Sequence, residues 1–180
     1  MRILVLAAAA AVLASGCNGT TENGESGGER KDAWPTAGEW RRTNQPPAGY
    51  PPADASVEGY AGEARAESLR RNGLQSLLVT QYLKEGFDAD PKNVDTRRIR
   101  VELWRHREAM GAAKTFQAWH GGHSINDVGE KAFADESAIV YLRANYVIRL
   151  VPTGPTWKKG EAAPVAIAVG RALDDWLSRK

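Results

Sequence analysis

The sequence predicts an α+β domain, in which a mostly antiparallel sheet of about four strands carries helices on one of its faces. Residues 74–83 and 98–104 have the pattern of strands, in which successive side chains point to opposite faces of a sheet. Residues 138–143 and 146–151 lie on either side of a two-residue turn, as in a hairpin. Three other segments carry apolar residues at the three- and four-residue spacing of helices. The expected order of elements is therefore α-β-β-α-β-β-α.

Start and stop signals place the three helices. The first is expected from residue 54 to about 72, before the stop signal Asn72-Gly73. The second runs over 107–119 and closes at Gly121-Gly122. The last, over 164–179, begins with a proline that suits a first helical turn, and its apolar stripe is expected to lie on the sheet.

The first sixteen residues have the features of a bacterial signal peptide. Arg2 supplies a positive charge, and residues 3–13 are apolar throughout, which is shorter than the roughly 20 residues of a membrane-spanning helix. The following Leu-Ala-Ser-Gly-Cys sequence, which ends at Cys17, resembles the lipobox of lipoproteins. That resemblance implies cleavage before Cys17, a diacylglyceryl thioether on its sulfur and an acylated amine such as a palmitoyl amide. The covalent lipid is the expected membrane anchor, and no other cofactor is expected.

Ordinary secretion is the alternative interpretation of this leader. Ala14-Ser15-Gly16 also resembles an A-x-A cleavage site, and cleavage there would leave Cys17 as a free thiol. Cys17 is the only cysteine, so no internal disulfide can form and the core must hold the fold unaided. In enteric-type sorting, Asn18 rather than Asp after the lipidated cysteine implies an outer-membrane anchor facing the periplasm, if the host is Gram-negative.

Composition divides the chain into four parts. Residues 1–16 are the signal peptide, and residues 17–32 are the lipidated cysteine with a flexible tether of small and charged residues. Residues 33–53 form a strap rich in tryptophan and proline, and residues 54–180 form a single α+β domain. Aromatic side chains in a polar segment indicate a strap that packs on the domain, and docking onto a partner is the alternative.

A basic stretch runs through the strand predicted at 98–104. It is suited to anionic lipid headgroups, a phosphate-bearing glycan or an acidic partner. A solvated sheet edge, balanced by carboxylates such as that of Glu102, explains the same pattern. The formal net charge of only +2 argues against a nucleic-acid partner. The candidate binding surface consists of Trp34, Trp40, Arg98, Arg100 and Trp104.

His120 and His123 are candidate metal ligands, because two imidazoles three residues apart at a helix end can converge on one ion. A site needs a third ligand, and His106, Asp127 and Glu130 are the nearest candidates in sequence. Histidines exposed at a helix end explain the pair without a metal.

Recognisable catalytic motifs are absent from the sequence. There is no G-x-S-x-G elbow, phosphate-binding loop or dinucleotide fingerprint. We therefore expect a non-enzymatic lipoprotein of the cell envelope that binds a protein, a lipid or a cell-wall component. The alternative is an envelope enzyme or metal-binding protein that uses His120 and His123.

Several short motifs between residues 38 and 149 occur together. They are Gly38-Glu39-Trp40, Tyr60-Ala61-Gly62-Glu63-Ala64, Gly73 with Tyr82, the RVELW run Arg100–Trp104, and Gly111-Ala112 with Phe116. In this combination the chain resembles an uncharacterised family of bacterial envelope lipoproteins and periplasmic proteins of unknown function. The resemblance covers about two thirds of the chain, and this chain has Ala61 where the family favours asparagine. It supports the α+β fold and implies no functional residues.

Overall fold

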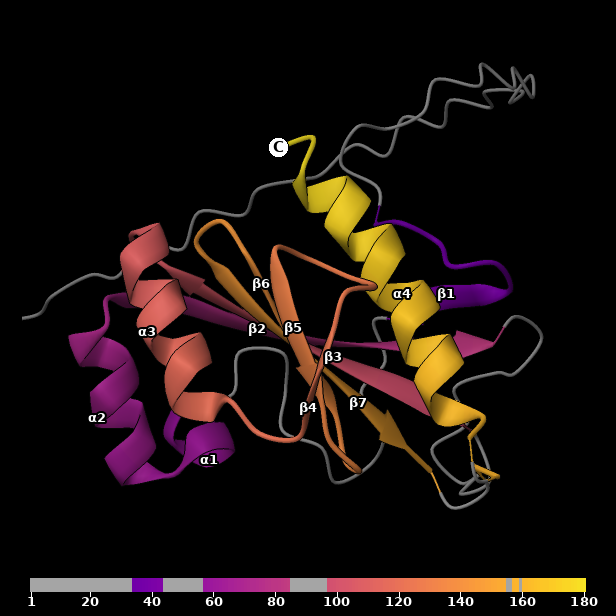
Figure 1. The fold of residues 1–180 in the computed structure, drawn as a ribbon, viewed down its shortest axis with the longest axis horizontal. Coiled ribbons are helices and arrows are strands. Elements are labelled where there is room, and N and C mark those ends of the chain that lie inside the picture. The colour runs from indigo at the N-terminus through magenta and orange to yellow at the C-terminus, as the bar shows by residue number, and fades with distance from the viewer. Residues whose placement is uncertain (1–33, 44–56, 85–96, 155–156, 159) are drawn as a thin grey trace, which may run out of the picture. The chain divides into compact units, whose positions relative to one another are not determined.

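A seven-stranded antiparallel sheet dominates the part of the chain that the computed structural model describes (Figure 1). The described residues are 34–43, 57–84, 97–154, 157–158 and 160–180. Cys17, the predicted signal peptide, the tether and the later part of the strap lie outside them. The described part of the strap belongs to the same compact unit as the domain.

The strands run in the order β1-β2-β3-β7-β6-β5-β4 across the sheet. The strands are β1 (Trp40–Thr43), β2 (Leu74–Lys84), β3 (Arg98–His106), β4 (His123–Ile125), β5 (Lys131–Ala134), β6 (Ile139–Arg143) and β7 (Tyr146–Thr153). The helices are α1 (Val57–Ala61), α2 (Glu63–Arg71), α3 (Ala109–Trp119) and α4 (Ala162–Leu177). The predicted α+β class and antiparallel pairing are confirmed.

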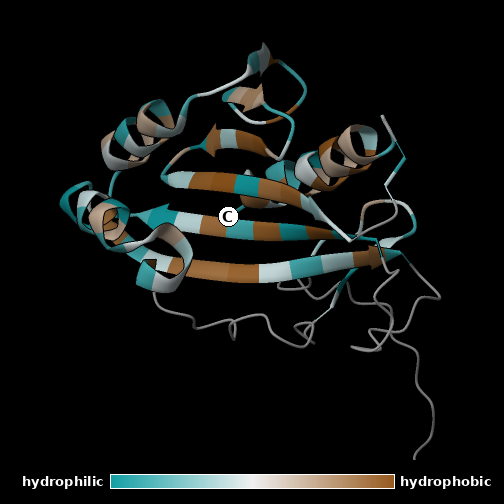
Figure 2. Cartoon of the chain, turned by 90° about the horizontal axis from the view of Figure 1, so that it is seen from below, coloured by the Kyte–Doolittle hydropathy of each residue, from teal (hydrophilic) through white to brown (hydrophobic). Residues whose placement is uncertain are grey.

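Three long strands form the centre of the sheet. β3 lies between β2 and β7, so that Val101 is opposite Thr80 on one side and Leu150 on the other. In the ribbon of Figure 2, hydrophobic and hydrophilic residues are interspersed along the strands of the sheet. β6 and β7 join through Ala144-Asn145, where Ala144 has a φ of 49°. These four strands are the ones that the sequence pattern predicts.

Three short strands extend the sheet at its edges. β1, β4 and β5 have four, three and four residues, too few for a period of two to be recognised in sequence. β1 belongs to the segment assigned to the strap and pairs with β2, placing Arg42 opposite Tyr82. The prediction of about four strands is therefore wrong for the described residues, because these edge strands arise from pairing with a neighbour.

The predicted order of elements is also wrong. The first helix of that order is two helices, because Gly62 between α1 and α2 has a φ of 76° that interrupts the helical backbone. With the extra strands, the described order is β-α-α-β-β-α-β-β-β-β-α. None of the helices in the described parts of the chain is long and apolar enough to cross a membrane.

Helices pack on both faces of the sheet, which corrects the prediction of one covered face. α4 places Val169 and Leu173 in a core cluster with Ile148, and α3 places Phe116 in a second cluster with Val147. Because Val147 and Ile148 are neighbours in β7, their side chains point to opposite faces. Figure 1 shows α1, α2 and α3 grouped together at one end of the sheet, apart from α4.

Candidate functional site

A pocket of about 220 Å³ lies on the face of the sheet that carries α2 and α3. Its walls come from α1 and α2, from the end of α3, and from β3, β5, β6 and β7. Aromatic and charged side chains share the lining. The aromatic residues are Tyr60, Trp104, Trp119 and Phe133, and the charged residues are Arg65, Glu102, Asp135 and Arg149.

The buried carboxylate of Glu102 lies at the centre of the charged group, with only 2% of its side chain exposed. Arg100 and Trp104 point to the same face of β3 as Glu102, since the three are two residues apart. The Arg100 Nε lies 2.9 Å from Glu102 Oε1, and the Trp104 indole Nε1 donates to Glu102 Oε2 at 3.4 Å. From β7, Arg149 is the register partner of Glu102 and donates from Nη1 to Oε1 at 3.5 Å. One carboxylate therefore has two guanidinium groups beside it.

Arg149 retains hydrogen-bonding capacity toward the pocket. A guanidinium has five N–H donors. Within the described residues, the one hydrogen bond that Arg149 donates is the long contact with Glu102. Its side chain is 35% exposed and lines the pocket, whereas Arg100 is more buried and does not line it. Of the two arginines beside Glu102, Arg149 is therefore the one that a bound ligand would meet.

The aromatic wall is held by ring contacts between distant segments. The rings of Trp104 and Trp119 meet edge to face with 5.1 Å between centroids. Arg65, from α2, lies over the Trp119 ring at 5.9 Å from its centroid. The ring centroids of Phe133 and Phe116 are 5.3 Å apart, and this contact joins β5 to α3. The aromatic side chains of the wall have a cationic side chain at their exposed edge.

Asp135 is part of the pocket lining, but its carboxylate is engaged locally. Its Oδ1 accepts hydrogen bonds from the backbone N–H groups of Ser137 and Ala138 and from the Ser137 hydroxyl. Burial alone raises the pKa of Asp135, but these hydrogen bonds and the nearby charge of Arg149 together lower it below its usual value. Asp135 therefore stays charged and serves mainly to shape the turn after β5.

The candidate surface predicted from sequence is divided between the two faces of the sheet. Trp34 and Trp40 pack on the cluster beneath α4, and Trp40 stacks on Trp157 with 5.8 Å between ring centroids. Arg98, Arg100 and Trp104 point to the opposite face, and Trp104 is buried. Only Arg100 and Trp104 of the predicted set contact the charged group around Glu102.

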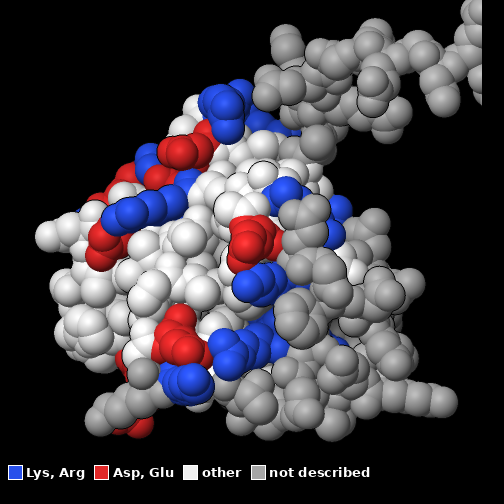
Figure 3. Space-filling view, turned by 90° about the vertical axis from the view of Figure 1, so that its right-hand side faces the viewer, with Lys and Arg blue, Asp and Glu red and all other residues white. Residues whose placement is uncertain are grey.

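The face of the molecule shown in Figure 3 carries basic and acidic side chains close together. Ion pairs on the described surface include Lys84 with Glu39 at 2.9 Å and Arg171 with Asp127 at 2.6 Å. Such mixed charge is typical of a solvated surface. It does not favour one sign of ligand.

The three histidines considered as metal ligands lie in different environments. The His120 ring packs against Phe116 and Phe133, and His123 is exposed at the start of β4. His106 is buried, and its Nδ1 donates to the carbonyl oxygen of Asn72 at 3.0 Å. Among the residues that the structure describes, no three His, Cys, Asp or Glu side chains gather where they could hold a metal ion.

Sequence reasoning did not identify Arg149, Arg65 or the aromatic residues at 60, 119 and 133 as site residues. The available signal was Glu102, a carboxylate placed in a strand with apolar neighbours on both sides. Buried carboxylates need partners, so this position pointed to a charged group nearby. The sequence did not reveal which arginine supplies it.

Comparisons of the chain with protein-family models, with curated proteins and with solved structures found no match. The class of protein that the geometry defines is an α+β domain with a pocket, lined by aromatic and charged side chains, between its sheet and three helices. The function is therefore inferred from the residues of the chain.

Proposed function

We propose that this chain is a non-enzymatic, lipid-anchored protein of the bacterial cell envelope that binds a small envelope or cell-wall component. The pocket that contains Glu102 and Arg149 is the single observation that carries the binding role. It combines aromatic side chains with a few fixed charges, as ligand sites commonly do. No cofactor is proposed apart from the covalent lipid on Cys17.

The proposed anchor rests on the amino-terminal sequence. The apolar run at residues 3–13 is followed by small residues and by Cys17, the only cysteine of the chain. Each buried methylene contributes about 0.8 kcal/mol, so several acyl chains hold a protein on a membrane almost permanently. We propose an outer-membrane anchor facing the periplasm in a Gram-negative host, on the basis of Asn18.

The anchor is tested by labelling. A bacterial host expressing the full chain is fed an alkyne analogue of palmitate, and the mature protein is analysed by intact mass. We expect label and the mass of a lipidated amino terminus in the wild type, and neither in Cys17→Ser. A wild-type protein with a bare thiol at Cys17, or with the leader still attached, would contradict the proposed anchor.

The binding role is tested by blocking the pocket. Ala118 is exposed on α3 and lines the pocket, and its neighbour Gln117 is exposed but does not line it. Ala118→Trp places an indole at the mouth, and Gln117→Trp is the matched control. In ligand-observed NMR with small amphiphilic fragments, we expect binding to the wild type and to Gln117→Trp and weak or absent binding to Ala118→Trp. Equal binding to the three proteins would overturn the pocket as the site.

A further inference from the structure

We propose that the pocket takes a small organic carboxylate, whose charge pairs with Arg149 and whose organic body lies beside Trp119. This inference rests on the proposed binding role and names the chemical class of the ligand. It is carried by the charge balance at Glu102, by the remaining donors of Arg149 and by the size of the pocket.

The charges around the pocket favour an anion. The lining carries two guanidinium groups, those of Arg65 and Arg149, and two carboxylates, those of Glu102 and Asp135, and the more buried Arg100 also lies beside Glu102. Both carboxylates are already engaged, Glu102 by the two arginines and the Trp104 indole, and Asp135 by its own turn. A cationic ligand would therefore compete with the groups that already bind Glu102 and Asp135. An anion would instead accept hydrogen bonds from the remaining N–H donors of Arg149.

The geometry at Arg149 suits a carboxylate. Its contact with Glu102 uses Nη1 at the long distance of 3.5 Å, which leaves other N–H groups of the same planar fork for a ligand. Guanidinium and carboxylate groups pair through two parallel hydrogen bonds, which fix orientation as well as charge. The floor supplies one such fork from β7, and Arg65 lies at the exposed edge of the aromatic wall.

The volume sets the size of the organic body. An apolar cavity of about 150 Å³ is large enough for benzene. A pocket of about 220 Å³ therefore holds one ring with a short carboxylate arm, or the end of a short acyl chain. It is below the roughly 300 to 1,000 Å³ of pockets for drug-sized ligands.

Isothermal titration calorimetry with matched probes tests the sign of the charge. The full-length protein, purified as the bacterial host processes it and placed in lipid nanodiscs, is titrated with phenylacetate, neutral phenylacetamide and cationic phenethylamine. Empty nanodiscs give the background. We expect phenylacetate to bind at least about tenfold more tightly than the other two, a difference of about 1.4 kcal/mol that a charge-assisted hydrogen bond can supply. Hexanoate, titrated in the same way, distinguishes an acyl chain from a ring as the source of the carboxylate.

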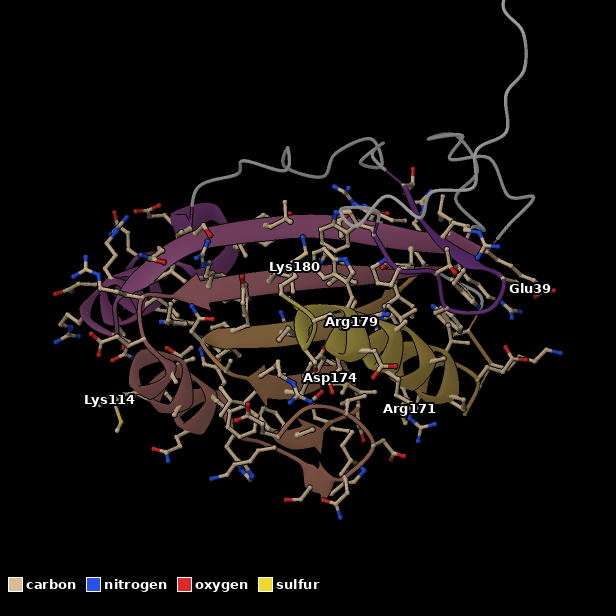
Figure 4. The ribbon with its side chains drawn as sticks, turned by 90° about the horizontal axis from the view of Figure 1, so that it is seen from above. Glu39, Lys114, Arg171, Asp174, Arg179 and Lys180 are labelled. Carbon is tan, nitrogen blue, oxygen red and sulfur yellow. The ribbon has the colours of Figure 1, made fainter. Side chains whose placement is uncertain are left out.

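Substitutions of Arg149 and Glu102 give a second test, because they should change the affinity for phenylacetate in opposite directions. Arg149→Gln should weaken phenylacetate binding by about tenfold, and Arg149→Lys should recover part of it, because the charge remains while the fork is lost. Glu102→Gln removes the competing carboxylate and should tighten phenylacetate binding. Lys114→Gln, which removes a cation from the exposed surface of α3, is the control (Figure 4). Circular dichroism and thermal melting confirm that each variant is folded.

The outcomes separate the inference from the proposed function. Preference for phenylacetate together with the Arg149 and Glu102 effects supports a carboxylate ligand. Tighter binding of phenylacetamide or phenethylamine, or weaker phenylacetate binding in Glu102→Gln, overturns the carboxylate and leaves the pocket as a binding site. If none of the four probes binds at millimolar concentration, both the inference and the binding role are wrong.

Discussion

The indole ring of Trp34 stacks on the ring of Trp176, with 5.1 Å between centroids and 24° between planes. The guanidinium of Arg42 lies 4.3 Å from the Trp34 centroid, and the amine of Lys180 lies 4.5 Å from the Trp176 centroid. Four side chains from the strap, β1, α4 and the residues after it therefore contact one another in series. This arrangement shows that the described part of the strap packs on the domain.

Trp34→Ala should lower the free energy of unfolding by about 2 kcal/mol, because a half-buried indole loses both apolar contact and ring stacking. Urea denaturation followed by circular dichroism measures this. Met110→Ala is the control, since Met110 is 64% exposed and its truncation should change stability by less than about 0.5 kcal/mol. A double-mutant cycle with Trp176→Ala should show coupling, and additive effects would mean that the stack contributes nothing.

Gly111→Ala should destabilise the protein, although alanine ordinarily stabilises a helix by about 0.5 to 1 kcal/mol relative to glycine. A Cβ at this position of α3 would lie 2.0 Å from the carbonyl oxygen of Asn72, so the helix must move. We expect a net loss of about 1 to 3 kcal/mol, as for other overpacked sites. The measurement is the urea midpoint at an unchanged m-value.

Gly121→Ala is the matched control for this prediction. A Cβ at Gly121 would approach nothing closer than the Trp119 carbonyl oxygen, at 3.9 Å, so little change is expected. If Gly111→Ala were as stable as the wild type or more so, the close approach of α3 to Asn72 would be wrong.

Arg143 and Asp174 join the β6–β7 hairpin to α4 through two hydrogen bonds, from Nε to Oδ1 and from Nη2 to Oδ2. Asp174 is labelled in Figure 4 on α4. Asp174→Asn should cost about 1 to 2 kcal/mol, because the pair is half-buried and bidentate rather than fully exposed. Chemical denaturation at low and high salt measures it. Asp175→Asn, on the exposed side of α4, should be nearly neutral, and an equal loss in both variants would contradict the role of the pair.

The buried imidazole of His106 should make stability depend on pH. Burial lowers the pKa of His106 below its usual 6.5, although its hydrogen bond to the Asn72 carbonyl acts in the other direction. Below pH 6.5 the unfolded chain therefore binds a proton that the folded chain resists. The free energy of unfolding should fall as the pH falls from 6.5 toward the lower folded-state pKa, and become level with respect to this group below it.

His106→Gln should flatten this dependence between pH 6.5 and 5, whatever its effect on stability at neutral pH. His123→Gln provides the comparison, since it removes a histidine that is exposed. Urea midpoints across the pH range give the slopes. The same slope in wild type and His106→Gln would show that another group is responsible.

The sequence predicts those elements that are long enough to show a repeating pattern of apolar residues. The alternation around Val101 and the apolar stripe of α4 each extend over several residues, and Asn145 supports a tight turn. β1, β4 and β5 carry too few residues for a period, and they form by pairing with a neighbour. The prediction that helices cover only one face is wrong because the pattern of a strand does not say which helix packs on which of its sides.

In the candidate site, too, the sequence indicated the residues that are close together in the chain but not the contacts between distant ones. Glu102 and Trp104 are close in sequence and were visible as a charged and aromatic strand, but Arg149 is 47 residues beyond Glu102. Their contact depends on the register between β3 and β7, which the local sequence does not contain. Arg65 reaches Trp119 only because α2 and α3 pack on one face.

The sequence by itself determined the α+β class, the four longer strands, the helical periodicity, and the motif that predicts a lipid at Cys17. Each is encoded by neighbouring residues, whose side chains alternate or recur within a few positions. Only the tertiary structure decided that helices cover both faces and that Glu102, Arg149 and Trp119 surround one pocket. The physical reason is that strand register and helix packing depend on contacts between residues far apart in the chain, which minimise free energy together rather than one segment at a time.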